Sequence, residues 1–392
     1  MLHRRALLVF SGLMIISSAL LAAACGADST PAASEVQEVV PDVASETVVE
    51  TPATGPGLFE VGPEMAVERV SPAGVEMGDG RLMVLGGRGK GQGRYATVHD
   101  DAEIYDPATG KWTPAGHMTA ERESPTATLL SDGKVLAIGG IDRLKDLAGG
   151  PDVFDPATGV WTATSDPVET REGHRAVLLQ DGRVLVVGGR NSLLRQLAMA
   201  ETYDPVADVW EEAGETAEVR SNHAVSVLAD GRVLVVGGGK LDGPHLKAAE
   251  LWNPATGTWS AAGTMAVSRA FHSATLLLDG RVLIVGGKGK KTSAELYDPE
   301  TGTWSSAGDT TDPRSEHQAV LLSDGRVLVA GGIGRIATAE LYDPATNTWS
   351  SADSMAETRY RFVALSLAAG KVIVVGGLMD DRITPTSEIF TP

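Results

Sequence analysis

The chain of 392 residues carries 33 Lys and Arg against 51 Asp and Glu, and this net charge of −18 disfavours non-specific binding to nucleic acid. Apolar residues make up 43% of the chain and charged residues 21%, which is typical of a folded protein. A single cysteine excludes an intramolecular disulfide and any multi-cysteine zinc or iron–sulfur site. Glycine is in excess, with 46 residues, but no Gly-x-y triplet repeat accompanies it, so a collagen-like structure is also excluded.

Residues 1–24 are typical of an export signal. Two arginines, Arg4 and Arg5, precede an apolar stretch from Ala6 to Leu21, and small residues lead to the only cysteine, Cys25. The run Leu21-Ala22-Ala23-Ala24-Cys25 resembles the lipobox of bacterial lipoproteins, with alanine where leucine is commoner at the third position before the cysteine. The resemblance implies cleavage before Cys25 and lipidation of that residue. An uncleaved helical anchor is the alternative, since the apolar run is long enough to be a membrane span.

The residue after the cysteine is Gly26, whereas some lipoproteins that stay in the inner membrane carry aspartate there. The resemblance therefore favours the outer membrane or the cell surface. From Gly26 to Leu58 the chain has six acids, no basic residue and no aromatic residue. Such a segment buries too little apolar surface to offset its ordering entropy. We expect 25–58 to be the lipidated cysteine with a disordered acidic linker, and 59–392 to be the folded part.

Beyond residue 58 the sequence repeats. Gly-Gly doublets end apolar runs at Gly86, Gly139, Gly188, Gly237, Gly286, Gly331 and Gly376. Tryptophans recur at Trp112, Trp161, Trp210, Trp259, Trp304 and Trp349. Each tryptophan lies 27 residues before the next Gly-Gly, whereas the segment after Gly-Gly varies in length. Length variation is therefore confined to one segment per repeat, as expected of a repeat architecture.

Each repeat predicts four short strands. The first runs from His174 to an Asp-Gly hairpin turn at Gly182, and the second follows directly to the Gly-Gly doublet. The third carries the Tyr-Asp-Pro sequence of 297–299, and the fourth carries Trp304 after a Pro-x-Thr-Gly turn. No stretch has helical periodicity, so leucine-rich and helical repeats are excluded. Four strands in 45 to 53 residues are typical of a propeller blade.

The Gly-Gly doublet, the Tyr-Asp-Pro turn and the tryptophan six residues after its aspartate resemble the kelch family over 59–392. The resemblance implies an all-β propeller whose blades have their first strand innermost. Counting back 27 residues from Gly86 gives Phe59, an aromatic residue in the tryptophan position. The chain ends on Ser387 to Pro392, a third strand with no fourth. We therefore expect seven four-stranded blades, closed by pairing of the strand about Phe59 with 387–392, which leaves no free sheet edge.

Two charged sets repeat in all seven blades. An arginine stands ten residues after each tryptophan or Phe59, at Arg69, Arg122, Arg171, Arg220, Arg269, Arg314 and Arg359. An acid stands three residues before each Tyr-Asp-Pro aspartate position, at Glu103, Asp152, Glu201, Glu250, Glu295, Glu340 and Glu388. The favoured interpretation is a structural ring of charge-assisted pairs, because scaffolds keep symmetry and sites break it. The alternative is that the arginines line the channel mouth and hold an anion.

The variable loops after Gly-Gly share one face with the connections between blades, and binding commonly resides on such loops. These loops hold 14 basic residues and seven acids, but the adjoining connections hold 17 acids and eight arginines. An anionic ligand is one hypothesis for this face, and solvated loop tips are the other. The candidate ligand-binding cations are Arg88, Arg94, Arg190, Arg195, Lys288, Lys290 and Lys291.

Histidine breaks the symmetry, because four consecutive repeats place it at the start of the first strand, at His174, His223, His272 and His317. These imidazoles are candidate ligand donors at the channel mouth. The alternative is a structural role, since Arg-x-x-His is common among kelch repeats. One ligand per blade is too wide a spacing for metal chelation, so no metal is expected.

Some kelch propellers are enzymes, notably the galactose-oxidase group and the sialic-acid epimerases. The copper site of the first group uses a tyrosine cross-linked to cysteine, and Cys25 lies outside the propeller, so that cofactor is not expected. His99 with Asp100 and Asp101, or Asp380 and Asp381 near Arg382, could form an acid/base pair. We expect a monomeric, non-catalytic envelope module without a cofactor or catalytic residue, which binds a protein or glycan but no nucleic acid, and touches the membrane only through its lipid. The alternative is a carbohydrate epimerase or lyase with its site in the propeller funnel.

Overall fold

The computed structural model describes residues 55–91, 96–239, 243–289, 291–380 and 382–392. Contacts divide the chain into two compact units, 1–50 and 51–392, and all described residues belong to the second. The expected signal segment, Cys25 as the expected lipidation site and most of the expected linker lie outside the described residues. No helix within the described ranges combines the length and apolar character that crossing a membrane would require.

The folded unit is built from seven four-stranded antiparallel sheets, which we call blades. Blades 1 and 2 comprise β2 (Ala73–Glu76), β3 (Leu82–Leu85), β4 (Asp101–Asp106) and β5 (Lys111–His117), then β6 (Thr126–Leu129), β7 (Val135–Ile138), β8 (Asp152–Asp155) and β9 (Val160–Ala163). Blades 3 and 4 comprise β10 (Arg175–Leu178), β11 (Val184–Val187), β12 (Met199–Asp204) and β13 (Val209–Glu215), then β14 (Ala224–Val227), β15 (Val233–Val236), β16 (Ala248–Asn253) and β17 (Thr258–Thr264).

Blades 5 and 6 comprise β18 (Ser273–Leu276), β19 (Val282–Val285), β20 (Ser293–Asp298) and β21 (Thr303–Asp309), then β22 (Gln318–Leu321), β23 (Val327–Ala330), β24 (Ala339–Asp343) and β25 (Thr348–Ser351). Blade 7 comprises β26 (Val363–Ser366), β27 (Val372–Val375), β30 (Ser387–Thr391) and β1 (Leu58–Val61). A 3₁₀ turn, η2 (Ala368–Gly370), joins its first two strands, and a small hairpin of β28 (Leu378–Met379) and β29 (Arg382–Ile383) precedes β30.

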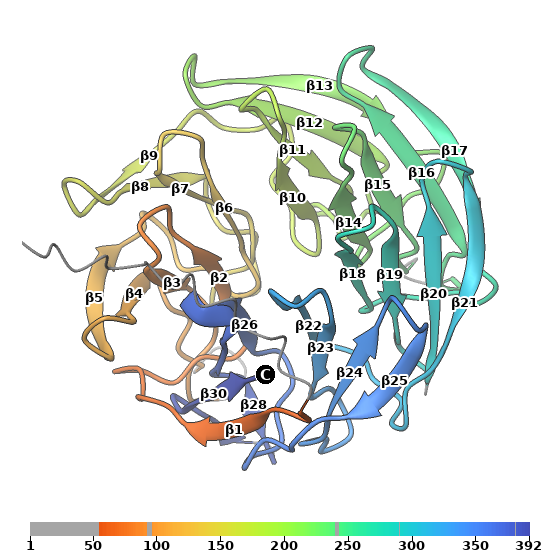
Figure 1. Ribbon diagram of the computed structural model, residues 1–392. Coiled ribbons are helices and arrows are strands. Elements are labelled where there is room, and N and C mark those ends of the chain that lie inside the picture. Colours follow the sequence, from red (N-terminus) through yellow and green to blue (C-terminus); the bar gives the residue numbers. More distant parts are fainter. Residues whose placement is uncertain (1–54, 92–95, 240–242, 290, 381) are drawn as a thin grey trace, which may run out of the picture. The chain divides into compact units, whose positions relative to one another are not determined.

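The blades form a ring with the first strand of each blade innermost (Figure 1). The first strands of neighbouring blades contact one another in turn, and β2 contacts β26 to complete the circle. Blade 7 is closed by strands from the two ends of the folded unit, since β1 pairs with β30 from Leu58–Thr391 to Val61–Glu388. The predicted seven-bladed all-β propeller, with closure about Phe59 and 387–392, is confirmed.

Burial explains the order of strands within a blade. The second strand of every blade is apolar and fully buried, as in Val184–Val187, because both of its faces pack against other blades. The fourth strand is mostly exposed. Between blades 3 and 4, Leu185 and Val187 pack with Val233, Val235 and Trp252 in one cluster. The core is therefore divided into layers between neighbouring blades, each too small to stand alone.

The repeated tryptophans join neighbouring blades. The indole of Trp161 donates a hydrogen bond to the carbonyl of Ala115 in the preceding blade, at 2.8 Å. Trp259 donates in the same way to Ala213, and Trp349 to Ala307 at 2.7 Å. Because a buried N–H needs an acceptor, this bond fixes the angle at which the fourth strand meets its neighbour.

Candidate binding face

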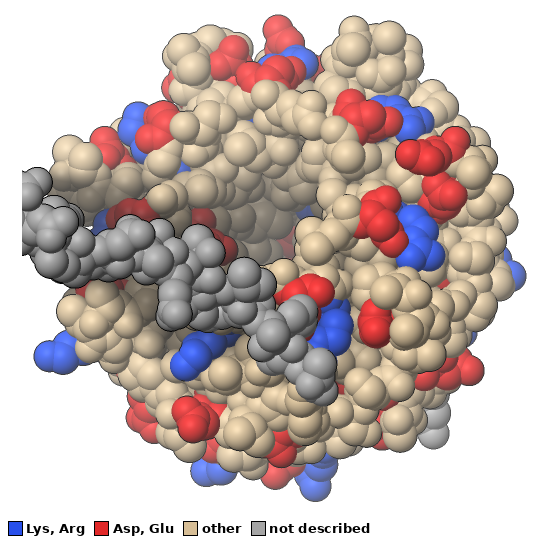
Figure 2. Space-filling view, in the orientation of Figure 1, with Lys and Arg blue, Asp and Glu red and all other residues tan. Residues whose placement is uncertain are grey.

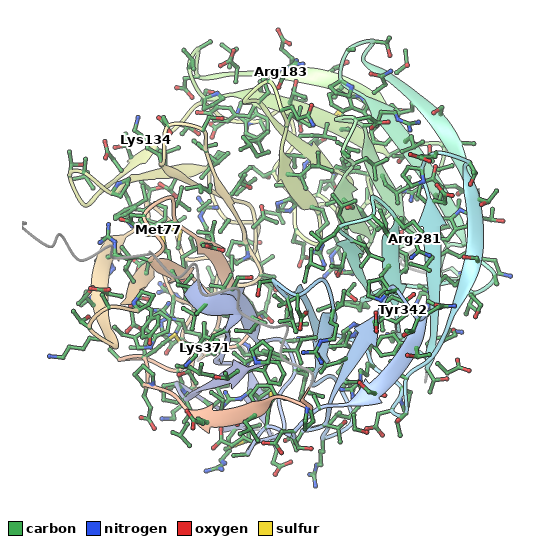
Figure 3. All side chains as sticks on the ribbon, in the orientation of Figure 1. Met77, Lys134, Arg183, Arg281, Tyr342 and Lys371 are labelled. Carbon is green, nitrogen blue, oxygen red and sulfur yellow. The ribbon has the colours of Figure 1, made fainter. Side chains whose placement is uncertain are left out.

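The ring has two faces of different construction. Lys134, Arg183 and Arg281 in Figure 3 follow the tight turns between the first two strands of their blades, so the figures view what we call the hairpin face. Here each basic residue pairs with the turn aspartate two positions earlier, as in Asp181–Arg183 at 2.8 Å and Asp279–Arg281 at 2.6 Å. Red and blue side chains accordingly lie side by side around the hollowed centre of Figure 2. The cation that ends this turn is paired with the aspartate of the same turn in blades 1 to 6.

The opposite, loop face carries the Gly-Gly doublets, the variable loops and the connections between blades. Beneath it each repeated arginine meets its repeated acid: Arg69–Glu103, Arg122–Asp152, Arg171–Glu201, Arg220–Glu250, Arg269–Glu295, Arg314–Glu340 and Arg359–Glu388. The seven arginines are at most 1% exposed. We call this set the ion-pair ring.

One blade illustrates the geometry of the ion-pair ring. Arg269 Nη2 lies 2.9 Å from Glu295 Oε1, and Nη1 donates to the carbonyls of Gly286 and Ser293 at 2.6 and 2.7 Å. The second carboxylate oxygen of Glu295 accepts the N–H of Ala266, in the connection that leads into the blade, at 2.7 Å. Burial lowers the pKa of Arg269, and the bond with Glu295 opposes that effect. Through these hydrogen bonds each ion pair links three elements: the connection that leads into the blade, the third strand and the Gly-Gly turn.

The Gly-Gly doublets are needed because the next blade comes so close. A Cβ on Gly188, whose φ is +59°, would lie 2.5 Å from the carbonyl oxygen of Arg220 in the following blade. The N–H of Gly189 donates to that same carbonyl at 2.8 Å. Glycine at the first position is thus required both by its left-handed backbone and by the contact.

A ring of left-handed residues borders the channel on the loop face. It consists of Ser71, Ser124, Gly173, Asn222, Phe271, Glu316 and Arg361, with φ between +53° and +62°. Neighbours in this ring are joined by backbone bonds, such as Phe271 N–H to Asn222 O at 2.9 Å and Asn222 N–H to Gly173 O at 2.9 Å. The repeat pattern of the sequence does not reveal this feature, because six residue types occupy the position in the seven blades.

The four repeated histidines lie inside the protein, between blades. The exposed fraction of their side chains is 1% for His174, 0% for His223 and 6% for both His272 and His317. His174 Nε2 lies 2.9 Å from Thr126 Oγ1, and His317 Nε2 lies 3.0 Å from Ser273 Oγ. Burial and the neighbouring ring arginines lower the pKa of His174, His272 and His317 to about 3, so the imidazoles are neutral at ordinary pH.

The candidate cations of the loops divide into three groups. Arg88 and Arg190 pair with Glu123 and Glu172 at 3.2 and 2.8 Å. Arg195 and Lys288 are exposed and Lys291 is half-buried, and the charges of the two lysines help burial to lower the pKa of His245. Arg94 and Lys290 lie outside the described residues. The structure therefore brings Lys288, Lys291 and His245 together and keeps Arg88 and Arg190 in separate ion pairs.

A groove of about 660 Å³ opens where blade 7 meets blade 1. Its walls are Arg88, Lys90 and Gly91 on one side and 378–379 with 382–386 on the other, and Glu64 and Glu357 from the connections complete it. It presents the cations Arg88, Lys90 and Arg382 together with the hydroxyls of Thr384 and Thr386. Cations, acids, hydroxyls and apolar side chains thus share one concave surface, which suits a polar ligand.

Residues 173–377 match the family model described as the KLHDC2/KLHL20/DRC7 Kelch-repeats domain, and residues 69–119 match the Kelch motif. The first match covers more than half of the chain. The chain belongs to this Kelch-repeat family. No curated protein matches it.

Solved structures show the same propeller fold. A fungal alcohol oxidase of the AA5 family, in complex with copper, is 19% identical with a TM-score of 0.68, over 85% of this chain and 76% of its own. The structure of YjhT is 17% identical with a TM-score of 0.57, over 74% of this chain and 99% of its own. Identities this low establish the kelch propeller fold alone.

Of the residues considered for acid/base chemistry, Asp381 lies outside the described residues, and His99, Asp100 and Asp101 are engaged in contacts within the propeller. His99 Nε2 lies 3.1 Å from the carbonyl of Glu68, and its Nδ1 lies 3.4 Å from Asp101. Burial raises the pKa of Asp101, but the bond with His99 and the charge of Arg69 outweigh it and hold that pKa well below its usual range. Asp100 pairs with the exposed His117 at 2.9 Å. Within the described ranges no three His, Cys, Asp or Glu side chains gather as metal ligands would.

Proposed function

We propose that this kelch propeller is a lipid-anchored, non-catalytic binding module of the bacterial cell envelope, whose loop face binds a protein or a glycan. Kelch propellers serve in general as protein-binding scaffolds. The observation that carries the proposal is the contrast between the faces. Charges of the hairpin face are paired within turns, whereas the loop face carries the groove beside blade 7 and exposed side chains on loops of varied length.

The loop face offers two kinds of contact surface. Leu144, Leu193 and Leu194 are exposed by 62%, 68% and 56% on the loops of two neighbouring blades. Exposed leucines of this kind suit a protein partner. The groove, with Arg382 and the hydroxyls of Thr384 and Thr386, suits a glycan or a polar peptide.

Photo-crosslinking in cells tests the choice of face for a protein partner. A photoreactive residue in place of Leu193 reports on the loop face, and one in place of Val206, which is 96% exposed in a turn of the hairpin face, is the matched control. Crosslinks from Leu193 and none from Val206 are expected. Crosslinks from Val206 alone would contradict the proposal.

A glycan array with the full-length protein in detergent tests the other ligand class. The variant Lys90→Glu/Arg382→Glu reverses two exposed charges of the groove, and Lys134→Glu changes a hairpin-face charge as a control. Loss of glycan binding in the first variant, with binding retained in the second, supports a glycan site on the loop face. Turnover of a bound sugar would instead favour the epimerase or lyase alternative, which the shared fold with an alcohol oxidase leaves open.

The envelope location rests on the lipobox-like sequence before Cys25. Cys25→Ala should move the protein from the membrane fraction to the soluble fraction, and radiolabelled palmitate should no longer be incorporated. Persistence in the membrane fraction with unchanged labelling would refute lipidation of Cys25, and it would leave the proposal about the loop face untouched.

A further inference from the structure

An eighth arginine lies beside the ion-pair ring but takes no part in it. Arg175 is the first residue of β10, the innermost strand of blade 3 (Figure 1). Its side chain is half-buried. Its Nη1 donates to the carbonyl of His174 at 3.2 Å. Among the described residues no carboxylate forms an ion pair with it, whereas every arginine of the ion-pair ring has one.

In three other blades the residue at the position of Arg175 makes a contact with the next blade. The first residue of the innermost strand reaches the next blade, as Thr126 reaches His174, Ser273 reaches His317, and Gln318 donates to the carbonyl of Phe362 at 2.8 Å. Arg175 holds the same position toward His223. Neither ring nitrogen of His223 has a hydrogen-bond partner in the part of the chain that the structure describes. A cation and an imidazole without a hydrogen-bond partner therefore occupy the two positions that a hydrogen bond joins in blades 2, 5 and 6.

The charge of Arg175 acts on three blades at once. It helps burial to lower the pKa of His174, His223 and His272, each of which precedes an innermost strand. Burial also lowers the pKa of Arg175 itself. A partly desolvated cation without a counter-charge destabilises a fold. A bound anion would remove that penalty and accept hydrogen bonds from both Arg175 and His223.

We propose that Arg175 and His223 form a binding site for a small anion, a halide or a short carboxylate, at the loop-face end of the central channel. The centre of the ring is hollowed on the hairpin face, which gives a small ion a route along the innermost strands (Figure 2). On the loop face the left-handed backbone ring from Ser71 to Arg361 narrows the mouth and favours a compact ligand. This site is independent of the loop-face partner.

Thermal unfolding of the full-length protein tests the site. Sodium chloride and sodium acetate are compared with sodium gluconate, a bulky anion, at equal ionic strength. One or both small anions should raise the unfolding midpoint of the wild type in a saturable way, because a ligand that binds only the folded state stabilises it. A response to chloride alone assigns a halide, and a response to acetate alone assigns a carboxylate. No response to either overturns the proposal.

Two variants make the test specific. Arg175→Gln should abolish the response and, in gluconate, melt no lower than the wild type, because it removes an uncompensated charge. Arg195→Gln makes the same change on an exposed loop and should keep the full response. An equal response in Arg175→Gln overturns the proposal. If that variant does not fold, crystals of the wild type soaked in bromide and in bromoacetate replace it, and absence of a bromine peak beside Arg175 in both overturns the site.

Discussion

The ring of Phe59 lies against the ring of Phe390, with centroids 5.0 Å apart and planes inclined by 50°. Five other blades have a tyrosine or phenylalanine in the same relation to a tryptophan, at 5.0 to 5.2 Å. The pair in blade 7 joins the two ends of the folded unit. Its one difference is chemical, because phenylalanine has no N–H to donate to the preceding blade.

Phe59→Trp should therefore stabilise the closure of the ring. The indole would face the carbonyl of Ala352, which packs beside Phe59 and corresponds to the Ala307 acceptor of Trp349. One added hydrogen bond is worth about 0.5–1.5 kcal/mol. Chemical denaturation measures the change, and Trp349→Phe is the matched control, which should lose about 1–3 kcal/mol. Equal stability of all three proteins would show that this bond contributes nothing.

The closure could be predicted because it depends on spacing. A repeat of fixed length from aromatic residue to Gly-Gly identifies Phe59 and the lone third strand of 387–392 without any knowledge of contacts. The same spacing singled out the seven arginines and seven acids that the structure places in pairs. The hydrogen bonds from tryptophan to the preceding blade were not predictable, since a backbone acceptor leaves no mark on residue type.

The ion-pair ring should tolerate the loss of one partner poorly. Arg269→Met leaves the carboxylate of Glu295 buried without its cation, which destabilises by about 3–5 kcal/mol. Arg281→Met removes a pair on the solvent-exposed hairpin face and should cost less than about 1 kcal/mol. Urea unfolding of both variants checks the difference, and similar losses would argue against a structural role for the buried pairs.

Stability should fall as the pH drops below about 6.5. His174, His272 and His317 have folded-state pKa values of about 3, so between pH 6.5 and 3 the unfolded chain binds protons that the folded chain does not. Each imidazole then lowers the free energy of unfolding by about 1.4 kcal/mol at one pH unit below its unfolded value. Melting temperatures from pH 7.5 to 5 measure the slope.

The variant His317→Phe tests the source of that slope. Phe362 occupies the same position in blade 7 and packs on Gly331 as His317 packs on Gly286, so phenylalanine fits there. In this variant the free energy of unfolding should depend less steeply on pH, by the contribution of one imidazole. His117→Gln is the control, because that imidazole is exposed and its bond with Asp100 raises its pKa. An unchanged slope in His317→Phe would exclude the buried histidine as its cause.

A hydroxyl at Ala224 should stabilise the fold. The equivalent Ser273 meets His317 Nε2 at 3.0 Å, whereas His272 Nε2, which follows Ala224 in the next blade, has no hydrogen-bond partner among the described residues. Ala224→Ser supplies one and should add about 0.5–1.5 kcal/mol to the free energy of unfolding. Ala224→Val adds volume without a hydroxyl, so a gain in that variant as well would mean that packing, not the hydrogen bond, is responsible.

The candidate sites were less accessible to sequence reasoning than the fold. The first residue of the innermost strand is Ala73, Thr126, Arg175, Ala224, Ser273, Gln318 or Val363, so no repeat draws attention to Arg175. Its importance comes from the absence of a nearby acid, which is a three-dimensional property. The histidines were recognised as a set, but the depth of their burial depends on how closely blades pack. Neighbouring blades approach closely because glycine lies opposite each imidazole.

The register of β1 against β30 sets the mechanical behaviour of the propeller. Leu58 pairs with Thr391, so the outermost residues of the two strands face each other across the sheet. Tension between the chain preceding Leu58 and the chain following Thr391 would load these hydrogen bonds one at a time, as in a zipper, and not all together in shear. The pairing of β1 with β30 closes the ring and stabilises it against heat. Under a modest pull in this direction, the same two strands would separate.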